Sequence, residues 1–271
     1  MELQYDHNPN PAAFSTEDTL VKWTEVDLTD FVQPKIIYHQ ASSDSPPQAF
    51  TFDPKRVTYD KDPVAAGNNL ATKYLSAKYE LPSAEMVELY VETPMMTTLF
   101  ACSGFRTESN RNGKMVENTN YSLNLSFNDI MTNQPVGDFY KAMYTWDKEI
   151  LRVIYANAKR WLPGVIIKSV DALETLFSGF CSPRKRQKDG QLFPPALTLR
   201  IPQKGKRLDV TCVDKNNNPF DVTQISKDTS VRAVFRHQVV FKSKGIEVRN
   251  EAVLIQVMES ARPTGFANPV F

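Results

Sequence analysis

Residues 121–127 read YSLNLSF, with large apolar residues alternating with small polar ones at all seven positions. Because successive side chains of a β-strand point to opposite faces of the sheet, this pattern is typical of a half-buried strand. The apolar face would join the core, while Ser122, Asn124 and Ser126 would meet water or a ligand. The stretch therefore predicts a sheet with one polar, accessible face.

Further strands are predicted on both sides of this one. They are expected at residues 87–92, 96–102, 196–201, 208–213, 231–241 and 246–257. The last two are separated by Ser243, Lys244 and Gly245, a short connection containing glycine that indicates a β-hairpin.

Two helices are predicted between the strands. Asp138 is the expected N-cap of the first, in which apolar residues recur at three- and four-residue spacing from residue 139 to 154 until residues 162–164 end it. The second is expected at residues 169–179. Strands, helices and further strands in this order predict an α+β fold. The simplest fold with this order of elements is an OB-like antiparallel β-barrel or sheet with a helical insertion between strands 3 and 4.

The chain divides into three predicted segments. Residues 1–85 are expected to form an extended N-terminal arm, because proline recurs along them and residues 1–50 carry 8 acidic but 2 basic side chains. Residues 86–258 form the predicted folded core, and residues 259–271 the C-terminal tail. Within the core, residues 103–120 are rich in Asn, Ser, Arg and Gly and are expected to be a mobile loop.

The formal net charge of +1 is a cancellation between two halves. Residues 1–150 carry 12 basic and 21 acidic side chains, whereas residues 151–271 carry 20 basic and 10 acidic ones. An asymmetry of this size points to an anionic partner such as nucleic acid or a membrane surface.

No catalytic or metal-binding motif can be assembled from the sequence. The three histidines stand in unrelated contexts, and the chain has no glycine-rich phosphate loop, HExxH motif or EF-hand loop. Cys102, Cys181 and Cys212 are too widely spaced for a Cys-x-x-Cys metal site, and their odd number argues against a disulfide framework. The sequence predicts a protein that is not an enzyme, has no cofactor and occupies a reducing compartment.

The sequence also predicts no membrane association. The longest apolar clusters, such as residues 165–167, are far shorter than the roughly 18 residues of a membrane span. The N-terminus has neither the basic start nor the apolar stretch of a secretory signal.

Basic residues gather on the predicted strands, turns and one linker of the second half. Arginine and lysine along a strand, with aromatic rings between them, suit single-stranded nucleic acid, since cations contact phosphates and rings stack on bases. Phe241 is the expected stacking ring. The candidate nucleic-acid-binding residues are Arg184, Lys185, Arg186, Lys188, Arg200, Lys204, Lys206, Arg207, Arg232, Arg236, Phe241, Lys242, Lys244 and Arg249.

Each of these features also has an ordinary structural interpretation. A single arginine on a strand most often only solvates that face, so the prediction depends on the density of cations on neighbouring strands. The basic linker at residues 185–188 also fits the loose form of a nuclear-import signal.

The order of several short motifs resembles a protein family of nucleo-cytoplasmic large DNA viruses. The motifs are VETP at residues 91–94, NYSLNLSF at 120–127, FPPALTLRIP at 193–202 and LIQV at 254–257. They are similar to the single-stranded DNA-binding proteins of such viruses, including the asfarvirus type with an OB-like core. The resemblance covers residues 87–258, and the acidic arm has no counterpart in it.

The resemblance implies a non-enzymatic protein that coats single-stranded DNA during viral replication or recombination, without strong sequence preference. It would act at the viral replication site of the infected cell, in the cytoplasm or the nucleus. Its partners would be single-stranded DNA or RNA, further copies of itself, and replication proteins contacted through the C-terminal tail. The alternative is a virion assembly protein in which the acidic half of one subunit packs on the basic half of the next.

Overall fold

The computed structural model describes residues 35–38, 48–66, 69–111, 114–181, 184–185, 192–193, 195–205, 207–243 and 245–259. Residues 1–34 of the expected arm and residues 260–271 of the expected tail lie outside these ranges.

The fold is α+β and is dominated by one large sheet. Its main path runs β2-β1-β7-β18-β19-β14-β10-β9. The strands in the first half of the chain are β1 (Lys35–Tyr38), β2 (Gln48–Thr51), β3 (Val57–Tyr59), β4 (Val64–Ala66), β5 (Asn69–Glu80), β6 (Met86–Glu88), β7 (Tyr90–Glu92), β8 (Met96–Thr97), β9 (Ser103–Arg111) and β10 (Lys114–Ser126). Those in the second half are β11 (Phe177–Ser178), β12 (Arg184–Lys185), β13 (Leu192–Phe193), β14 (Ala196–Ile201), β15 (Gln203–Lys204), β16 (Arg207–Leu208), β17 (Thr211–Asp214), β18 (Ser230–Lys242) and β19 (Gly245–Glu259).

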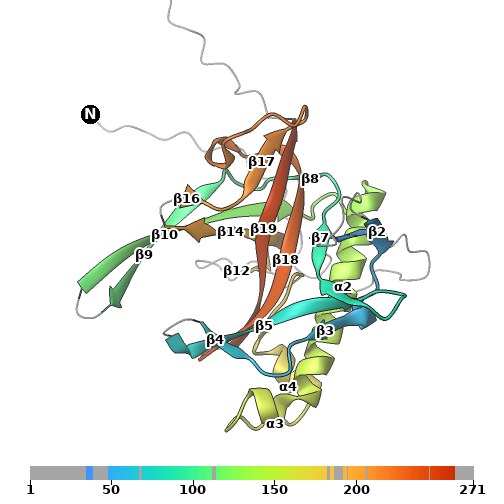
Figure 1. Cartoon of the computed structure of the whole chain (residues 1–271), viewed down its shortest axis with the longest axis vertical. Coiled ribbons are helices and arrows are strands. Elements are labelled where there is room, and N and C mark those ends of the chain that lie inside the picture. The colour runs from blue at the N-terminus through green and yellow to red at the C-terminus, as the bar shows by residue number, and fades with distance from the viewer. Residues whose placement is uncertain are drawn as a thin grey trace, which may run out of the picture.

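The long hairpin of β18 and β19 forms the centre of the sheet (Figure 1). Its register places Arg236 opposite Glu251 and His237 opposite Asn250, with an irregularity between Val234 and Phe235. The predicted strands at 231–241 and 246–257 and the predicted hairpin are therefore confirmed. β14 matches the predicted strand at 196–201, and β10 contains residues 121–126 of the predicted strand at 121–127.

The sheet is mixed and open, which corrects the prediction of an antiparallel barrel. β19 pairs in parallel with β11, β14 and β17, while its pairing with β18 is antiparallel. The main path ends at β2 on one side and at β9 on the other. A single β-bridge between Thr98 and Leu125 brings the segment after β8 beside β10. This bridge lies outside the named strands and does not close the sheet into a barrel. Alternation of polar and apolar residues carries no information on strand direction, so the parallel pairings were not predictable from it.

Part of the expected N-terminal arm belongs to the sheet. β5 pairs with β18, and β3, β4 and β6 pair with β5. Phe52, Leu75 and Tyr79 are almost completely buried in the core. The boundary at residue 85 therefore does not separate an arm from a core over residues 52–85. Of the prolines on which the arm prediction depends, Pro54 lies between β2 and β3 and Pro63 between β3 and β4, while the others lie outside the described residues.

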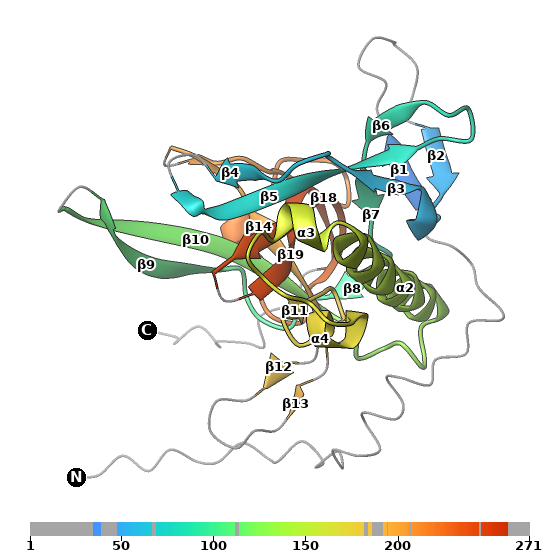
Figure 2. The same cartoon turned by 90° about the horizontal axis from the view of Figure 1, so that it is seen from below.

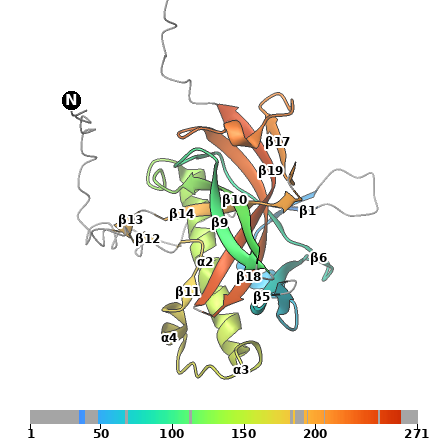
Figure 3. The same ribbon diagram turned by 90° about the vertical axis from the view of Figure 1, so that its left-hand side faces the viewer.

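Residues 103–120 form most of the β9–β10 hairpin rather than a loop. The pairing runs from Lys114 opposite Arg111 to Ser122 opposite Ser103, and the hairpin extends away from the body of the molecule (Figures 1 and 2). In Figure 3 it lies in front of the sheet. A hairpin that leaves the core needs no apolar face, so its mostly polar sequence resembled that of a loop.

The helices lie between β10 and β14 in the chain. They are α2 (Gln134–Ala156), α3 (Ala158–Trp161) and α4 (Val170–Glu174), and α2 lies along one side of the sheet (Figure 2). Asn133 is the N-cap of α2, with Asp138 inside the helix and buried, so the predicted start was about one turn late. Ser169 caps α4, as the prediction of a helix starting there requires. Strands β1 to β10 precede the helices in the chain, so the helices do not follow the third strand, as the prediction of an insertion between strands 3 and 4 requires. No helix among the described residues is long and apolar enough to cross a membrane.

Trp146 of α2 joins the helix to the sheet. Its ring lies 4.8 Å from Phe52 and 4.8 Å from Phe180, and 4.4 Å from the imidazole of His237 on β18, measured between ring centroids. Trp146 is fully buried. This packing fixes the segment around Phe180 against β18 and β19, next to the groove described below.

Candidate nucleic-acid interface

A groove with a volume of about 490 Å³ opens where β14 and β19 separate. The parallel pairing of the two strands joins Leu199 with Asn250 and Arg200 with Glu251. Earlier along β19, the neighbour is β11 instead, with Ser178 opposite Glu247. One wall therefore comes from β10 and β14, and the other from β11, the segment after it, and the start of β19. The lining residues are Asn120, Tyr121, Ser122, Ser178, Gly179, Phe180, Ala196, Thr198, Arg200, Lys242, Glu247, Val248, Arg249 and Asn250.

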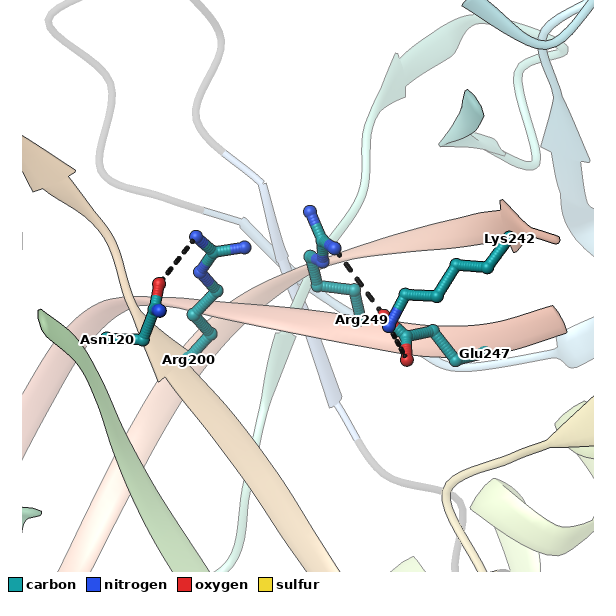
Figure 4. A network of polar contacts seen from close by, with 5 residues as sticks. All are labelled: Asn120, Arg200, Lys242, Glu247 and Arg249. Atoms are coloured by element: carbon teal, nitrogen blue, oxygen red, sulfur yellow. Dashed lines mark hydrogen bonds and ion pairs between the residues drawn. The ribbon is translucent and has the colours of Figure 1, made fainter. Parts of the chain in front are cut away.

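Three cations and one carboxylate line this groove, and Figure 4 shows them with Asn120. Nη2 of Arg200 on β14 donates a hydrogen bond of 3.3 Å to Oδ1 of Asn120 on β10. Among the described residues, no carboxylate forms an ion pair with Arg200. Burial, together with the positive charge of Arg249, lowers the pKa of Arg200 below its ordinary value. Two guanidinium groups thus share one partly buried groove.

Glu247 is the carboxylate of the groove. Its Oε1 accepts from Nη2 of Arg249 at 3.4 Å, and its Oε2 accepts from Nζ of Lys242. Both cations on the β18–β19 side of the groove are therefore paired with one carboxylate, whereas Arg200 on the opposite wall is paired with an amide.

The wall formed by β10 and β14 is polar, as the alternation at residues 121–127 predicted. Ser122 lies opposite Arg200 and Asn124 opposite Thr198 in the antiparallel register of the two strands. The Thr198 hydroxyl donates to Oδ1 of Asn124 at 2.8 Å. Tyr121, which is only partly buried, also lines the groove. It was not among the predicted site residues. The alternation predicts Tyr121 on the core face of the strand, and the residue does pack against the core while contributing to the lining.

The opposite wall is held by a buried carboxylate. Asp147 of α2 accepts hydrogen bonds from the backbone amides of Phe180 at 2.9 Å and Cys181 at 3.0 Å. Burial raises the pKa of Asp147 to about 7, against the opposing effect of these two hydrogen bonds. A Cβ atom at Gly179 would stand 2.3 Å from Oδ1 of Asp147, so a residue without a side chain is needed there. Asp147 thus fixes the course of residues 179–181 along the groove.

A chain of buried polar side chains lies behind the same wall. Nε1 of Trp146 donates to the Tyr59 hydroxyl at 3.2 Å, which lies 3.4 Å from Nε2 of His237. Nδ1 of His237 lies 3.2 Å from Oδ1 of Asn250, which lines the groove. Burial lowers the pKa of His237 to about 3, so the imidazole is neutral near pH 7. A neutral imidazole with Nδ1 as donor satisfies both contacts.

Two of the predicted strand arginines are paired with carboxylates outside the groove. Arg236 donates from Nε at 3.0 Å and from Nη2 at 2.7 Å to Oε2 of Glu251, which lies directly opposite in the sheet. Nη1 of Arg232 lies 3.7 Å from Oε1 of Glu92 on β7. These pairs neutralise charges that the sequence pattern counted as a basic face. The pairing partners come from neighbouring strands, so they were not visible before the register was known.

The predicted stacking role of Phe241 is wrong. The side chain is 5% exposed, and its ring lies 6.2 Å from that of Trp161 in an edge-on arrangement. A ring packed in this way offers no face to a base. Phe241 belongs to the core face of β18.

The other predicted residues fall into three groups. Lys204 and Arg207 are exposed on the small β15–β16 hairpin, four and seven residues beyond Arg200, and no ion pair is formed with them among the described residues. Arg184 and Lys185 form β12, which pairs with β13 in a separate two-stranded sheet. Arg186, Lys188, Lys206 and Lys244 lie outside the described residues.

Within the described ranges, no group of three or more His, Cys, Asp or Glu side chains is placed to hold a metal ion. Cys102, Cys181 and Cys212 are buried thiols that form no disulfide.

No protein-family model matches the sequence, and no curated protein matches it. The chain is similar to solved structures of two bacteriophage proteins. The single-stranded DNA-binding protein of bacteriophage Enc34, in complex with single-stranded DNA, matches with a TM-score of 0.36 and 11% identity over 69% of this chain and 93% of that one. The single-stranded DNA-binding protein gp2.5 of bacteriophage T7 matches with a TM-score of 0.33 and 14% identity over 67% of this chain and 97% of that one. The resemblance to proteins of large DNA viruses stays a prediction.

Proposed function

We propose that this chain binds single-stranded DNA in the groove between β14 and β19, through phosphate contacts and base stacking. The observation that carries the proposal is the partly buried Arg200, which has an amide partner and stands beside a second guanidinium. Like charges in a partly buried site repel each other more strongly than in water, and a bound anion relieves that repulsion. Glu251 and Glu247 offset part of this repulsion at Arg200, and a bound phosphate would offset more of it.

The groove offers more than a single anion site. Beyond Arg200, the exposed Lys204 and Arg207 continue the line of cations onto the β15–β16 hairpin. Tyr121, Ser122 and Thr198 line the same groove as the arginines. A strand of nucleic acid presents phosphates at regular intervals and, when unpaired, presents bases that stack on aromatic rings. This combination favours a single strand over a small anion or a duplex, whose bases are stacked on one another.

Under this proposal the protein is a non-enzymatic DNA-binding protein that covers replication or recombination intermediates of a large DNA virus, at the site of viral replication. Contacts with phosphates and stacked rings do not distinguish one base from another, so binding would have little sequence preference. β12 comes shortly after residues 179–181 in the chain, and these residues run along one wall of the groove. We therefore propose that Arg184 and Lys185 extend the interface.

The test is fluorescence anisotropy with labelled oligo-dT, beside oligo-U and a duplex of equal length. Single-strand binding should be tighter than duplex binding and should weaken with salt. Four phosphate contacts, through Arg200, Lys204, Arg207 and Arg249, give an expected slope of log K against log salt of about −3. Equal affinity for the duplex would reject the groove as a single-strand site. Absence of binding, together with ordered assemblies in light scattering, would support the virion assembly alternative.

A further inference from the structure

Glu247 stands between the two cations on one side of the groove. Its two carboxylate oxygens are divided between Lys242 and Arg249, as Figure 4 shows. The side chain of Arg249 is 23% exposed and that of Glu247 is 31% exposed, so the pair is partly shielded from water. A shielded ion pair is screened less by salt than a surface pair.

The backbone of Glu247 is fixed, but its side chain is held by these two cations. Glu247 lies opposite Val240 of β18 on one side and opposite Ser178 of β11 on the other. The hydrogen bonds formed by the carboxylate among the described residues go to Lys242 and Arg249. Rotation of the side chain away from the groove would therefore break two ion pairs and leave the sheet intact.

Arg249 has donors left for a second acceptor. A guanidinium carries five N–H groups in a planar fork, and the contact with Glu247 uses Nη2 at the long distance of 3.4 Å. Arg200 stands on the opposite wall, and the guanidinium groups of the two arginines point the same way in Figure 4. A phosphate bound to both arginines would compete with the Glu247 carboxylate for Arg249 and would be repelled by its charge.

We propose that Glu247 is an internal competitor of the nucleic-acid phosphate, occupying Lys242 and Arg249 in the free protein and turning away when a phosphate bridges Arg200 and Arg249. The inference rests on the proposed function, because it concerns the same groove. Glu247 would lower the affinity for single strands and let the protein be displaced from DNA, since the carboxylate returns to Arg249 as the phosphate leaves.

The test is the change in oligo-dT affinity on E247Q, measured by fluorescence anisotropy at low salt. Glutamine has nearly the same shape and still offers one oxygen to Lys242, but it carries no charge. We expect binding to tighten roughly 3- to 10-fold, because about 1 kcal/mol of competing ion-pair energy is removed. E247A should tighten binding in the same direction. E92Q is the matched control, since it frees Arg232, a strand arginine that does not line the groove, and should change affinity less than about 2-fold.

Failure of the inference differs from failure of the proposed function. If R200Q weakens binding while E247Q and E247A bind no tighter than E92Q, the groove binds DNA and the role of Glu247 is rejected. If R200Q binds as the unmodified protein does, the groove itself is rejected as the binding site. Circular dichroism melting of each variant shows that an affinity change does not come from loss of the fold.

Discussion

Asp147 and Gly179 are the pair of residues on which the shape of the groove wall depends. The Asp147 carboxylate accepts hydrogen bonds from two backbone amides of the wall. Gly179 lets the chain pass within van der Waals contact of this carboxylate. The role of each residue in the wall follows from these contacts. Neither residue type stands out in the sequence, because a lone aspartate on a helix usually faces water.

Substitution G179A should destabilise the protein by about 1–3 kcal/mol, since the new Cβ would stand 2.3 Å from a buried, hydrogen-bonded carboxylate. Urea denaturation followed by circular dichroism measures the free energy of unfolding. The neighbouring S178A is the control, because Ser178 is exposed and should change that free energy by less than about 0.5 kcal/mol. Equal stability of G179A and the unmodified protein would show that the wall moves freely.

Asp147 and His237 make opposite contributions to the pH dependence of stability. The pKa of Asp147 is raised from 3.8 to about 7, so the stability it contributes is full at low pH and is lost as pH rises from about 4 to 7. The pKa of His237 is lowered from 6.5 to about 3, so its contribution is full above pH 6.5 and is lost as pH falls. In the shared window between about pH 4 and 6.5 the two effects oppose each other.

D147N removes the contribution of Asp147 to the pH dependence of stability and leaves that of His237. Its free energy of unfolding should fall with decreasing pH between 6.5 and 4 more steeply than that of the unmodified protein, by up to about 1.4 kcal/mol per pH unit. Urea denaturation at several pH values measures the two profiles. Parallel profiles would mean that Asp147 is not protonated in the folded protein in this window.

At the scale of elements, the long strands were predictable and the short or polar ones were not. The strands at 196–201, 231–241 and 246–257 are recognisable because many of their apolar residues pack on the core. β9 leaves the core and therefore lacks that signal, and β5 pairs with β18 across more than 150 residues of chain. Such long-range pairing leaves no local trace in the sequence.

The candidate site was predictable in part for the same reason. Arg200, Lys242 and Arg249 were found from their density on strands, and the structure places all three in one groove. Arg232 and Arg236 have the same pattern but are paired with carboxylates of neighbouring strands. Which cations line one groove and which carboxylates face them depends on strand register, and no spacing within one strand reveals it.

The β15–β16 hairpin should add phosphate contacts to the groove. Changing both Lys204 and Arg207 to glutamine should reduce the magnitude of the salt slope for oligo-dT by about 1.4, since each lost phosphate contact accounts for about 0.7. Anisotropy titrations over a range of salt give the slope. K159Q, in an exposed lysine of α3, should leave it unchanged. An unaltered slope in the double variant would place the DNA path elsewhere.

At the scale of the whole molecule, the net charge of +1 conceals an acidic first half and a basic second half. Residues 1–34 hold most of the acidic excess of the first 50 residues, and β1 begins at Lys35. This excess of negative charge should repel the phosphates of a nucleic acid, most strongly at low salt. Deletion of residues 1–34, which leaves β1 and β2 in place, should then tighten oligo-dT binding at low salt and less so at high salt. Unchanged affinity would reject this role.

The affinity of R200Q for oligo-dT, compared with that of R232Q, tests the central claim most directly. Arg200 is the groove cation with an amide partner, whereas Arg232 lies outside the groove beside Glu92. Loss of one charge-assisted phosphate contact should weaken R200Q by roughly 10-fold or more, while R232Q should stay within about 2-fold of the unmodified protein. Equal loss in both variants, or no loss in R200Q, would contradict the assignment of the groove between β14 and β19 as the site of single-stranded DNA binding.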